Sequence, residues 1–151
     1  MYVDPDVVEF ISANFLPVRV HVREQADEFK RLGGRFDAHW TPTILVIAPD
    51  GAEKHRIEGF LPKDDFLAQL MLGLGHSAFA SGRFAEARRW FDQALERYPR
   101  TDAAPEAQYW SGVAVYKETG DNAALVATAE RFKKRYSDTT WAKKSSVWDR
   151  G

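Results

Sequence analysis

The side chains in this sequence best suited to bind a metal or move a proton at neutral pH are four histidines. No two of them are spaced four residues apart, and no set of carboxylates accompanies them in the pattern of a metal site. His21 and His55 fall on two predicted strands that could be neighbours, which would allow a weak metal site, but ordinary sheet-face histidines are expected. The other two are His39 and His76. The sequence predicts no metal site, no cofactor and no catalytic constellation of the Ser-His-Asp type.

Cysteine is absent from all 151 residues. Its absence excludes disulfides, cysteine-ligated zinc, iron–sulfur clusters and a thiol nucleophile. Thiolate attack needs a sulfur that the thioether of methionine cannot supply. The sequence therefore predicts that this chain is not an enzyme of thiol chemistry.

Charge and hydropathy argue against two kinds of partner. The chain has 21 Lys and Arg against 22 Asp and Glu, and its basic stretch over 131–135 is interleaved with acidic residues, so we expect no nucleic-acid partner. The longest strongly apolar run, 44–48, is far shorter than the roughly 20 residues that span a bilayer, so no membrane partner is expected. The acidic first ten residues do not form a secretory signal, which predicts a cytoplasmic protein, or a periplasmic one if the true start lies upstream of Met1.

The elements that must position any site change in kind along the chain. Asp4 and Pro5 are typical of a helix start, and Pro17 is expected to stop that helix. Alternating valines predict a half-buried strand, and a continuous β-branched run predicts a strand buried on both faces. The elements expected in the first half are a helix over 5–16, a strand over 18–22, a helix from about 25 to 34, and a hairpin of strands 43–47 and 54–59.

From Pro62 onward the hydrophobic period is that of helices, and the sequence repeats itself. Gly82 recurs as Gly120, and Thr101 recurs as Thr139, both at an offset of 38 residues. The predicted helix pairs are 64–81 with 84–98 and 104–118 with 122–136. A last amphipathic segment, 140–148, is expected to cover the exposed face of the second pair as a terminal cap.

The 71–99 segment resembles a tetratricopeptide (TPR) repeat. The residues that carry the resemblance are Leu74, Gly75, Gly82, Phe84, Ala87, Phe91, Ala94 and Pro99. The longer connection between the two pairs is similar to that of extended repeats in bacterial envelope-assembly proteins. The resemblance implies a groove that binds a protein segment through aromatic anchors, although packing within the chain or in a homodimer is favoured over an external ligand. The groove residues expected are Leu72, His76, Phe79, Tyr109, Val113, Tyr116 and Lys117.

Residues 5–70 resemble the second half of a thioredoxin fold. The resemblance rests on Trp40-Thr41-Pro42-Thr43 with the following strand, on the hairpin, and on the stretch from Phe15 to Val20. It implies a cis bond before Pro42. It also implies a loop of Trp40, Thr41 and Pro42 that could add an extended peptide to its backbone. The alternative is that Pro42 only sets a turn before the strand.

The same resemblance implies that two strands and a Cys-x-x-Cys motif of that fold are missing. In the family, one of those strands lies between the counterparts of 18–22 and 43–47. Strand edges left without partners must find them elsewhere. We therefore expect either direct pairing of 18–22 with 43–47 in a reduced sheet, or pairing across a dimer.

The sequence as a whole predicts an α+β protein. Residues 1–70 form a truncated thioredoxin-like domain with a reduced sheet and a β-hairpin, and residues 71–151 form an all-α TPR domain with a C-terminal capping helix. The function expected is a redox-inactive module that binds a protein or peptide partner and associates with itself. The alternative is a fragment of a thioredoxin-family thiol–disulfide oxidoreductase whose Cys-x-x-Cys segment lies upstream of Met1.

Overall fold

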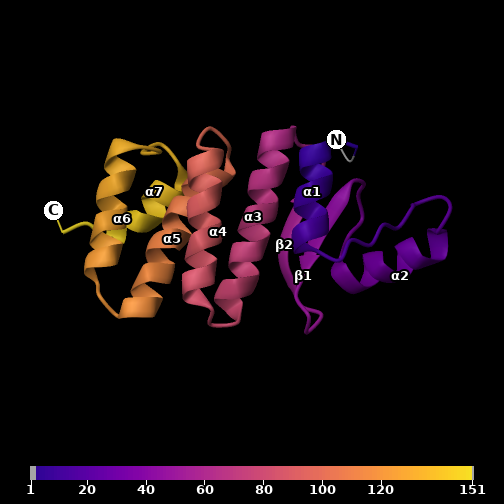
Figure 1. The fold of residues 1–151 in the computed structure, drawn as a ribbon, viewed down its shortest axis with the longest axis horizontal. Coiled ribbons are helices and arrows are strands. Elements are labelled where there is room, and N and C mark those ends of the chain that lie inside the picture. Colours follow the sequence, from indigo (N-terminus) through magenta and orange to yellow (C-terminus); the bar gives the residue numbers. More distant parts are fainter. Residues whose placement is uncertain (1–2, 151) are drawn as a thin grey trace. The chain divides into compact units, whose positions relative to one another are not determined.

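The chain folds into two compact units, which we describe separately (Figure 1). The structure is a computed structural model that describes residues 3–150. The first unit ends at Lys63 and the second begins at Asp64. This division lies earlier than the expected one after residue 70, which falls inside a continuous helix.

The first unit contains two helices, α1 (Pro5–Asn14) and α2 (Ala26–Phe36). The predicted start of α1 is confirmed, because the Asp4 carboxylate caps the helix by accepting from the Asp6 backbone N–H at 3.0 Å. Helix α2 was expected to end at Gly33 and Gly34, but it continues to Phe36. Gly33 lies so close to the chain beyond the helix that a Cβ would be 2.7 Å from the Ala38 carbonyl oxygen. The glycine therefore allows the close turn that leads out of α2.

The predicted hairpin is confirmed as the antiparallel pair β1 (Thr43–Ile47) and β2 (Glu53–Glu58). Gly51 in the connecting turn has a φ of +86°, the left-handed conformation that glycine adopts at no steric cost. The expectation that 43–47 is buried on both faces is wrong, because Ile47 is 40% exposed. A two-stranded sheet covers its central residues less completely than the larger parallel sheets in which such apolar runs are common.

The expected strand over 18–22 is absent. Residues 15–21 have no regular secondary structure, 22–25 form a turn, and Val18 is 82% exposed. The only sheet among residues 3–150 has the order β1–β2, so the expectation that 18–22 pairs directly with 43–47 in this chain is wrong. Alternating side chains make a segment suitable for a strand, but the strand forms only when a neighbour takes up its backbone N–H and C=O groups.

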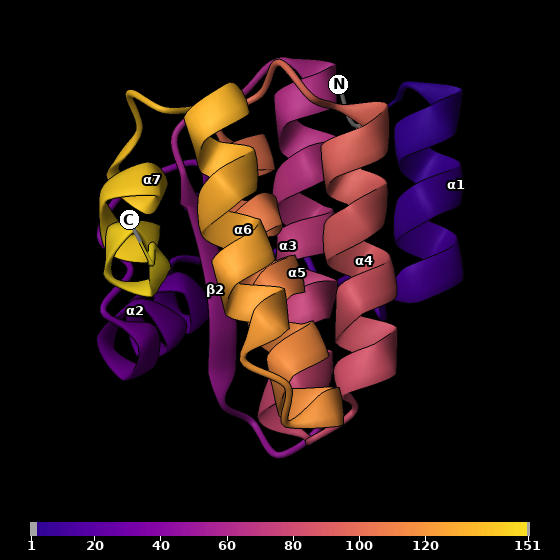
Figure 2. The same cartoon turned by 90° about the vertical axis from the view of Figure 1, so that its left-hand side faces the viewer.

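The second unit is all-helical, and the predicted pairs and cap are confirmed (Figure 2). Consecutive helices run antiparallel, α4 packs on α5 and α5 on α6, and α7 contacts both α5 and α6. None of the helices within residues 3–150 is both long and apolar enough to cross a membrane. The elements are α3 (Lys63–Ala80), α4 (Phe84–Arg97), α5 (Ala103–Thr119), α6 (Ala123–Lys134), α7 (Thr140–Ser145) and the 3-10 turn η1 (Ser146–Trp148).

The sequence repeat is also a repeat of local structure. The hydroxyl of Thr101 donates to the carbonyl of Tyr98 at 2.8 Å, and the hydroxyl of Thr139 donates to the carbonyl of Tyr136 at 2.7 Å. Each contact closes the turn that follows the second helix of its pair. The Tyr136 hydroxyl then joins the two turns by donating to the Pro99 carbonyl at 2.6 Å.

Candidate protein-binding site

The loop of Trp40, Thr41 and Pro42 lies directly before β1, with all three residues exposed. The peptide bond between Thr41 and Pro42 is cis. Two hydrogen bonds fix the loop to the hairpin: the Thr43 hydroxyl donates to the Trp40 carbonyl at 2.6 Å, and the Gly59 backbone N–H donates to the Pro42 carbonyl at 2.8 Å. The Trp40 side chain is 69% exposed, which leaves a large aromatic surface open to solvent on an anchored loop.

Five of the predicted groove residues lie in half-buried positions on the first helices of the two pairs. His76 and Phe79 belong to α3, whereas Tyr109, Val113 and Tyr116 lie along one stripe of α5 at helical spacing. Leu72 requires a correction: its side chain is fully buried, so it belongs to the core and offers no surface to a partner. Its position on the same stripe of α3 gave no indication of that burial.

Aromatic rings from α3 and α5 meet in one cluster, which we call the aromatic cluster: His76, Phe79, Tyr109 and Trp110. The Trp110 ring lies edge-on to the other three rings, with centroid distances of 5.3 to 5.4 Å. A ring nitrogen of His76 lies 3.3 Å from a carboxylate oxygen of Glu106. Sequence reasoning missed Trp110, the ring at the centre of the cluster. Helical spacing could have indicated it. Trp110 lies four residues before Ala114, on the buried side of α5, and three residues before Val113, on the open side.

The C-terminal cap covers part of this cluster. Tyr109 stacks on Trp148 of η1 at a centroid distance of 4.9 Å and contacts Trp141 of α7 at 5.3 Å. The Lys144 ammonium lies 4.1 Å from the centre of the Trp141 ring. Burial raises the pKa of the Tyr109 hydroxyl above its usual value. Tyr109 is therefore an internal contact to the cap.

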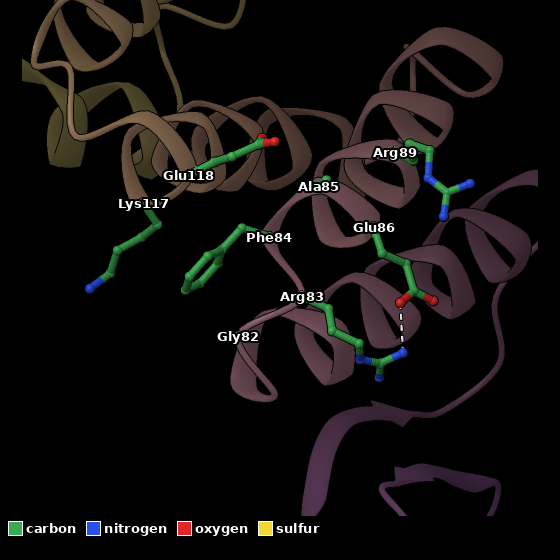
Figure 3. A pocket seen from close by; sticks show the side chains of 8 residues that line it. All are labelled: Gly82, Arg83, Phe84, Ala85, Glu86, Arg89, Lys117 and Glu118. Carbon is green, nitrogen blue, oxygen red and sulfur yellow. Dashed lines mark hydrogen bonds and ion pairs between the residues drawn. The ribbon is translucent and has the colours of Figure 1, made fainter.

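Lys117 lines a shallow pocket of about 680 Å³ beside the turn between α3 and α4 (Figure 3). Arg83 and Glu86 form an ion pair of 2.6 Å on its wall. None of the four cluster residues lines the pocket, but Phe84 of its lining lies against the Phe79 ring at a centroid distance of 5.1 Å, so the pocket borders the aromatic cluster. The lining residues are Gly82, Arg83, Phe84, Ala85, Glu86, Arg89, Lys117 and Glu118.

Within residues 3–150, no three His, Asp or Glu side chains lie together in a way that could hold an ion. His21, on which a weak site with His55 was considered, instead accepts from the backbone N–H groups of Arg23 and Glu24 at 3.3 and 3.2 Å. That nitrogen is occupied by the turn it stabilises.

Comparison with protein families agrees with both units. Residues 1–72 match the family model of a thioredoxin-like domain, and residues 68–101 match that of a tetratricopeptide repeat. This chain therefore carries a thioredoxin-like domain followed by a TPR repeat. Repeats of this kind typically mediate protein–protein interaction. Neither the curated proteins nor the solved structures gave a match.

Proposed function

We propose that this chain is a protein-interaction module without redox activity. The helical unit binds a segment of a partner protein through its first helices, and the Trp40–Pro42 loop offers a second contact surface. The chain also associates with itself. The observation that carries the proposal is the aromatic cluster, in which Trp110 is braced by rings from two helices.

A braced aromatic surface suits binding for an energetic reason. Aromatic side chains supply a large contact area and are enriched among the residues that dominate interface affinity. Because the rings of Phe79 and Trp110 already hold each other edge to face, little conformational freedom is lost when a partner covers them. Val113 and Tyr116 continue the half-exposed stripe along α5, so the surface suits an extended segment or a helix laid along it.

The absence of thiol catalysis is proposed on chemical grounds. Thiol–disulfide exchange needs a thiolate, and this chain contains no cysteine. In an insulin-reduction assay with dithiothreitol, we expect the purified chain to leave the turbidity rate at that of buffer. A rate above the buffer control that follows the chain through purification would overturn this part of the proposal.

The second candidate is a fragment of a thiol–disulfide oxidoreductase, favoured by the thioredoxin-like match over residues 1–72. In-frame DNA upstream of the Met1 codon distinguishes the two candidates. A Trp-Cys-x-x-Cys sequence within a few dozen codons would favour the fragment, whereas a stop codon would favour the interaction module.

Site-directed photo-cross-linking tests the binding surface. A photoreactive phenylalanine derivative replaces Val113 on the stripe in one variant and Glu96, an exposed residue of α4, in the matched control. In cells that express the chain, we expect discrete adducts to a protein partner from position 113 and none from position 96. Replacing Trp110 with alanine should abolish the adducts at 113. Equal labelling from both positions would show that the stripe is not a specific surface.

A further inference from the structure

Strand β1 leaves one edge without a backbone partner. Among residues 3–150 the sheet consists of β1 and β2 alone, so each residue of β1 pairs on one side only. An apolar edge of this kind, Thr-Ile-Leu-Val-Ile, is a ready template for another strand, and proteins normally cover or disrupt such edges. No charge, proline or bulge protects the first four residues of β1, since the irregularity lies between Val46 and Ile47.

The same chain contains a segment that lacks a partner of its own. We call residues 16–20, Leu-Pro-Val-Arg-Val, the extended segment. Its backbone makes no hydrogen bond within the described part of the chain, and Leu16 and Val18 are 92% and 82% exposed. Exposed aliphatic side chains on an unpaired β-prone backbone are unfavourable in water, so this segment is suited to form a strand when a neighbouring strand is supplied.

The proline in the segment determines which of its edges can pair. Backbone groups of alternate residues in a strand point to the same side, so Pro17 and Arg19 present one edge, and Leu16, Val18 and Val20 present the other. Pro17 lacks an N–H, so its edge must face away from the ladder. The segment therefore pairs through the edge of Leu16, Val18 and Val20, on which every N–H is available.

The alternation of side chains in the extended segment also matches that of β1. In the hairpin, Ile44 is opposite Ile57 on one face, and Leu45 is opposite Arg56 on the other. The apolar face is the buried one, with Val46 and Ile57 almost fully covered. The Gly59 N–H donates to the Pro42 carbonyl, so alternate residues Ile44 and Val46 direct their backbone groups toward β2, and the residues between them offer theirs to the free edge. When the segment adds beside β1 in the parallel sense, in which directly opposite residues use opposite edges, its three aliphatic side chains fall on that apolar face and Arg19 falls on the face of Arg56.

The opposite face of the sheet, which carries Leu45 and Arg56, is electrostatically suited to a cation. The Arg56 guanidinium is bracketed by the carboxylates of Glu53 at 2.6 Å and Glu58 at 3.1 Å, which leaves an excess of one negative charge. Arg56 also donates to the Asp37 carbonyl at 3.0 Å and to the Phe36 carbonyl, at the negative end of α2. Arg19 would lie about 10 Å from these groups, two strand spacings away.

We propose that two copies of this chain form a dimer in which the extended segment of each adds, in the parallel sense, to the free edge of β1 in the other. This inference names the surface for the self-association proposed above and rests on it. We assign a second copy as the partner because each chain carries both the free edge of β1 and the extended segment but does not pair them with each other. A two-fold axis then satisfies both edges at once, whereas a foreign strand on β1 would leave the extended segment exposed.

Two proline variants test the ladder in the full chain by sedimentation velocity. Val20→Pro removes an N–H from the pairing edge, and Arg19→Pro, its matched control, removes one from the edge that faces away. The backbone of neither position makes a hydrogen bond within residues 3–150, so both variants should fold. We expect the wild type to dimerise at about 10–100 µM, with Val20→Pro weakening the dimer about tenfold or more and Arg19→Pro less than about fivefold.

The possible outcomes distinguish a failure of the proposed dimer surface from a failure of self-association itself. A wild type that stays monomeric throughout this range would overturn both proposals. A dimer that Val20→Pro leaves unchanged would overturn this surface while self-association through another part of the chain survives. Equal weakening by the two prolines would contradict the assigned edge.

Disulfide trapping tests the faces directly, because the chain has no native cysteine. A Val18→Cys chain is mixed with an Ile44→Cys chain, or with a Leu45→Cys chain as control, and oxidised. We expect cross-linked heterodimers with position 44 or, if the register is shifted by two residues, with Val46→Cys, and at least about tenfold less with position 45, whose Cβ points to the other face. Equal yields, or no heterodimer with any partner, would overturn the pairing.

Discussion

Gly75 of α3 lies against the ring of Phe91 of α4 with no room for a side chain between them. A Cβ at position 75 would be 2.4 Å from the Phe91 Cε1 atom. Gly112 of α5 has the same relationship to Thr128 of α6, where a Cβ would lie 1.9 Å from the hydroxyl oxygen. In each pair, the first helix provides a glycine and the second fills the space with a fully buried side chain. Close packing of this kind fixes how the two helices of a repeat approach each other.

Replacing Gly75 with alanine should therefore destabilise the helical unit. The added methyl cannot be accommodated without displacing a buried ring, and overpacking of this kind costs about 1–3 kcal/mol. Urea unfolding followed by far-UV circular dichroism measures the change. Gly34→Ala is the control, because nothing lies within 4 Å of a Cβ at that helical position, and it should be neutral or stabilising. Wild-type stability in Gly75→Ala would contradict the close approach.

The helical repeat could be predicted from sequence because its signals are local. The spacing of Gly75, Gly82 and Phe91 specifies which faces meet, and a 3.6-residue period needs no distant partner to be recognised. The hairpin was predictable for the same reason, since its two strands and turn are contiguous. The burial of Leu72 was not, because a leucine on a helix stripe can face either a neighbouring element or the solvent.

The extended segment shows the limit of a local pattern. Residues 18–22 alternate as a strand does, but whether a strand forms depends on a neighbour that the pattern itself cannot supply. The aromatic cluster was predictable in part for a similar reason. Three of its four residues, His76, Phe79 and Tyr109, could be placed by helical spacing. The involvement of Trp148 with Tyr109 depends on how the cap folds back, which spacing does not specify.

Removal of the Trp148 ring should loosen the cap. Trp148→Ala loses the stack on Tyr109, and an aromatic pair contributes about 0.5–1.5 kcal/mol beyond its buried area. We therefore expect a lower free energy of unfolding in urea. Val147→Ala is the matched control, since that neighbouring side chain is 80% exposed and should change stability by less than about 0.5 kcal/mol. Equal stability of both variants would mean that the cap does not depend on the stack.

Alkaline stability should depend on Tyr136. Burial raises the pKa of its hydroxyl above the usual 10.0, with Arg135 partly opposing the shift. Because the folded-state pKa is the higher one, this stabilisation is complete below about pH 10 and is lost as pH rises through the folded value. Tyr136→Phe should lower stability at pH 7 by about 1 kcal/mol through the lost bond to Pro99, and should flatten the decline above pH 10. Urea midpoints at pH 7 to 11 check both effects, and a decline as steep as in wild type would contradict them.

The stability of the first unit at acidic pH should depend in part on Asp4. The hydrogen bond from the Lys63 ammonium, 3.0 Å away, is the main cause that lowers the pKa of the Asp4 carboxyl. A depressed folded-state pKa gives stabilisation that is present above the unfolded value of 3.8 and is lost as pH falls through the folded one. Lys63→Met removes the donor, so the Asp4 pKa should rise toward its ordinary value while the backbone bond from Asp6 remains. Carboxyl-carbon NMR titration of Asp4 measures the shift, and Lys30→Met, an exposed lysine of α2, should leave it unchanged. An Asp4 pKa that is the same in wild type and in Lys63→Met would show that this ion pair does not form in solution.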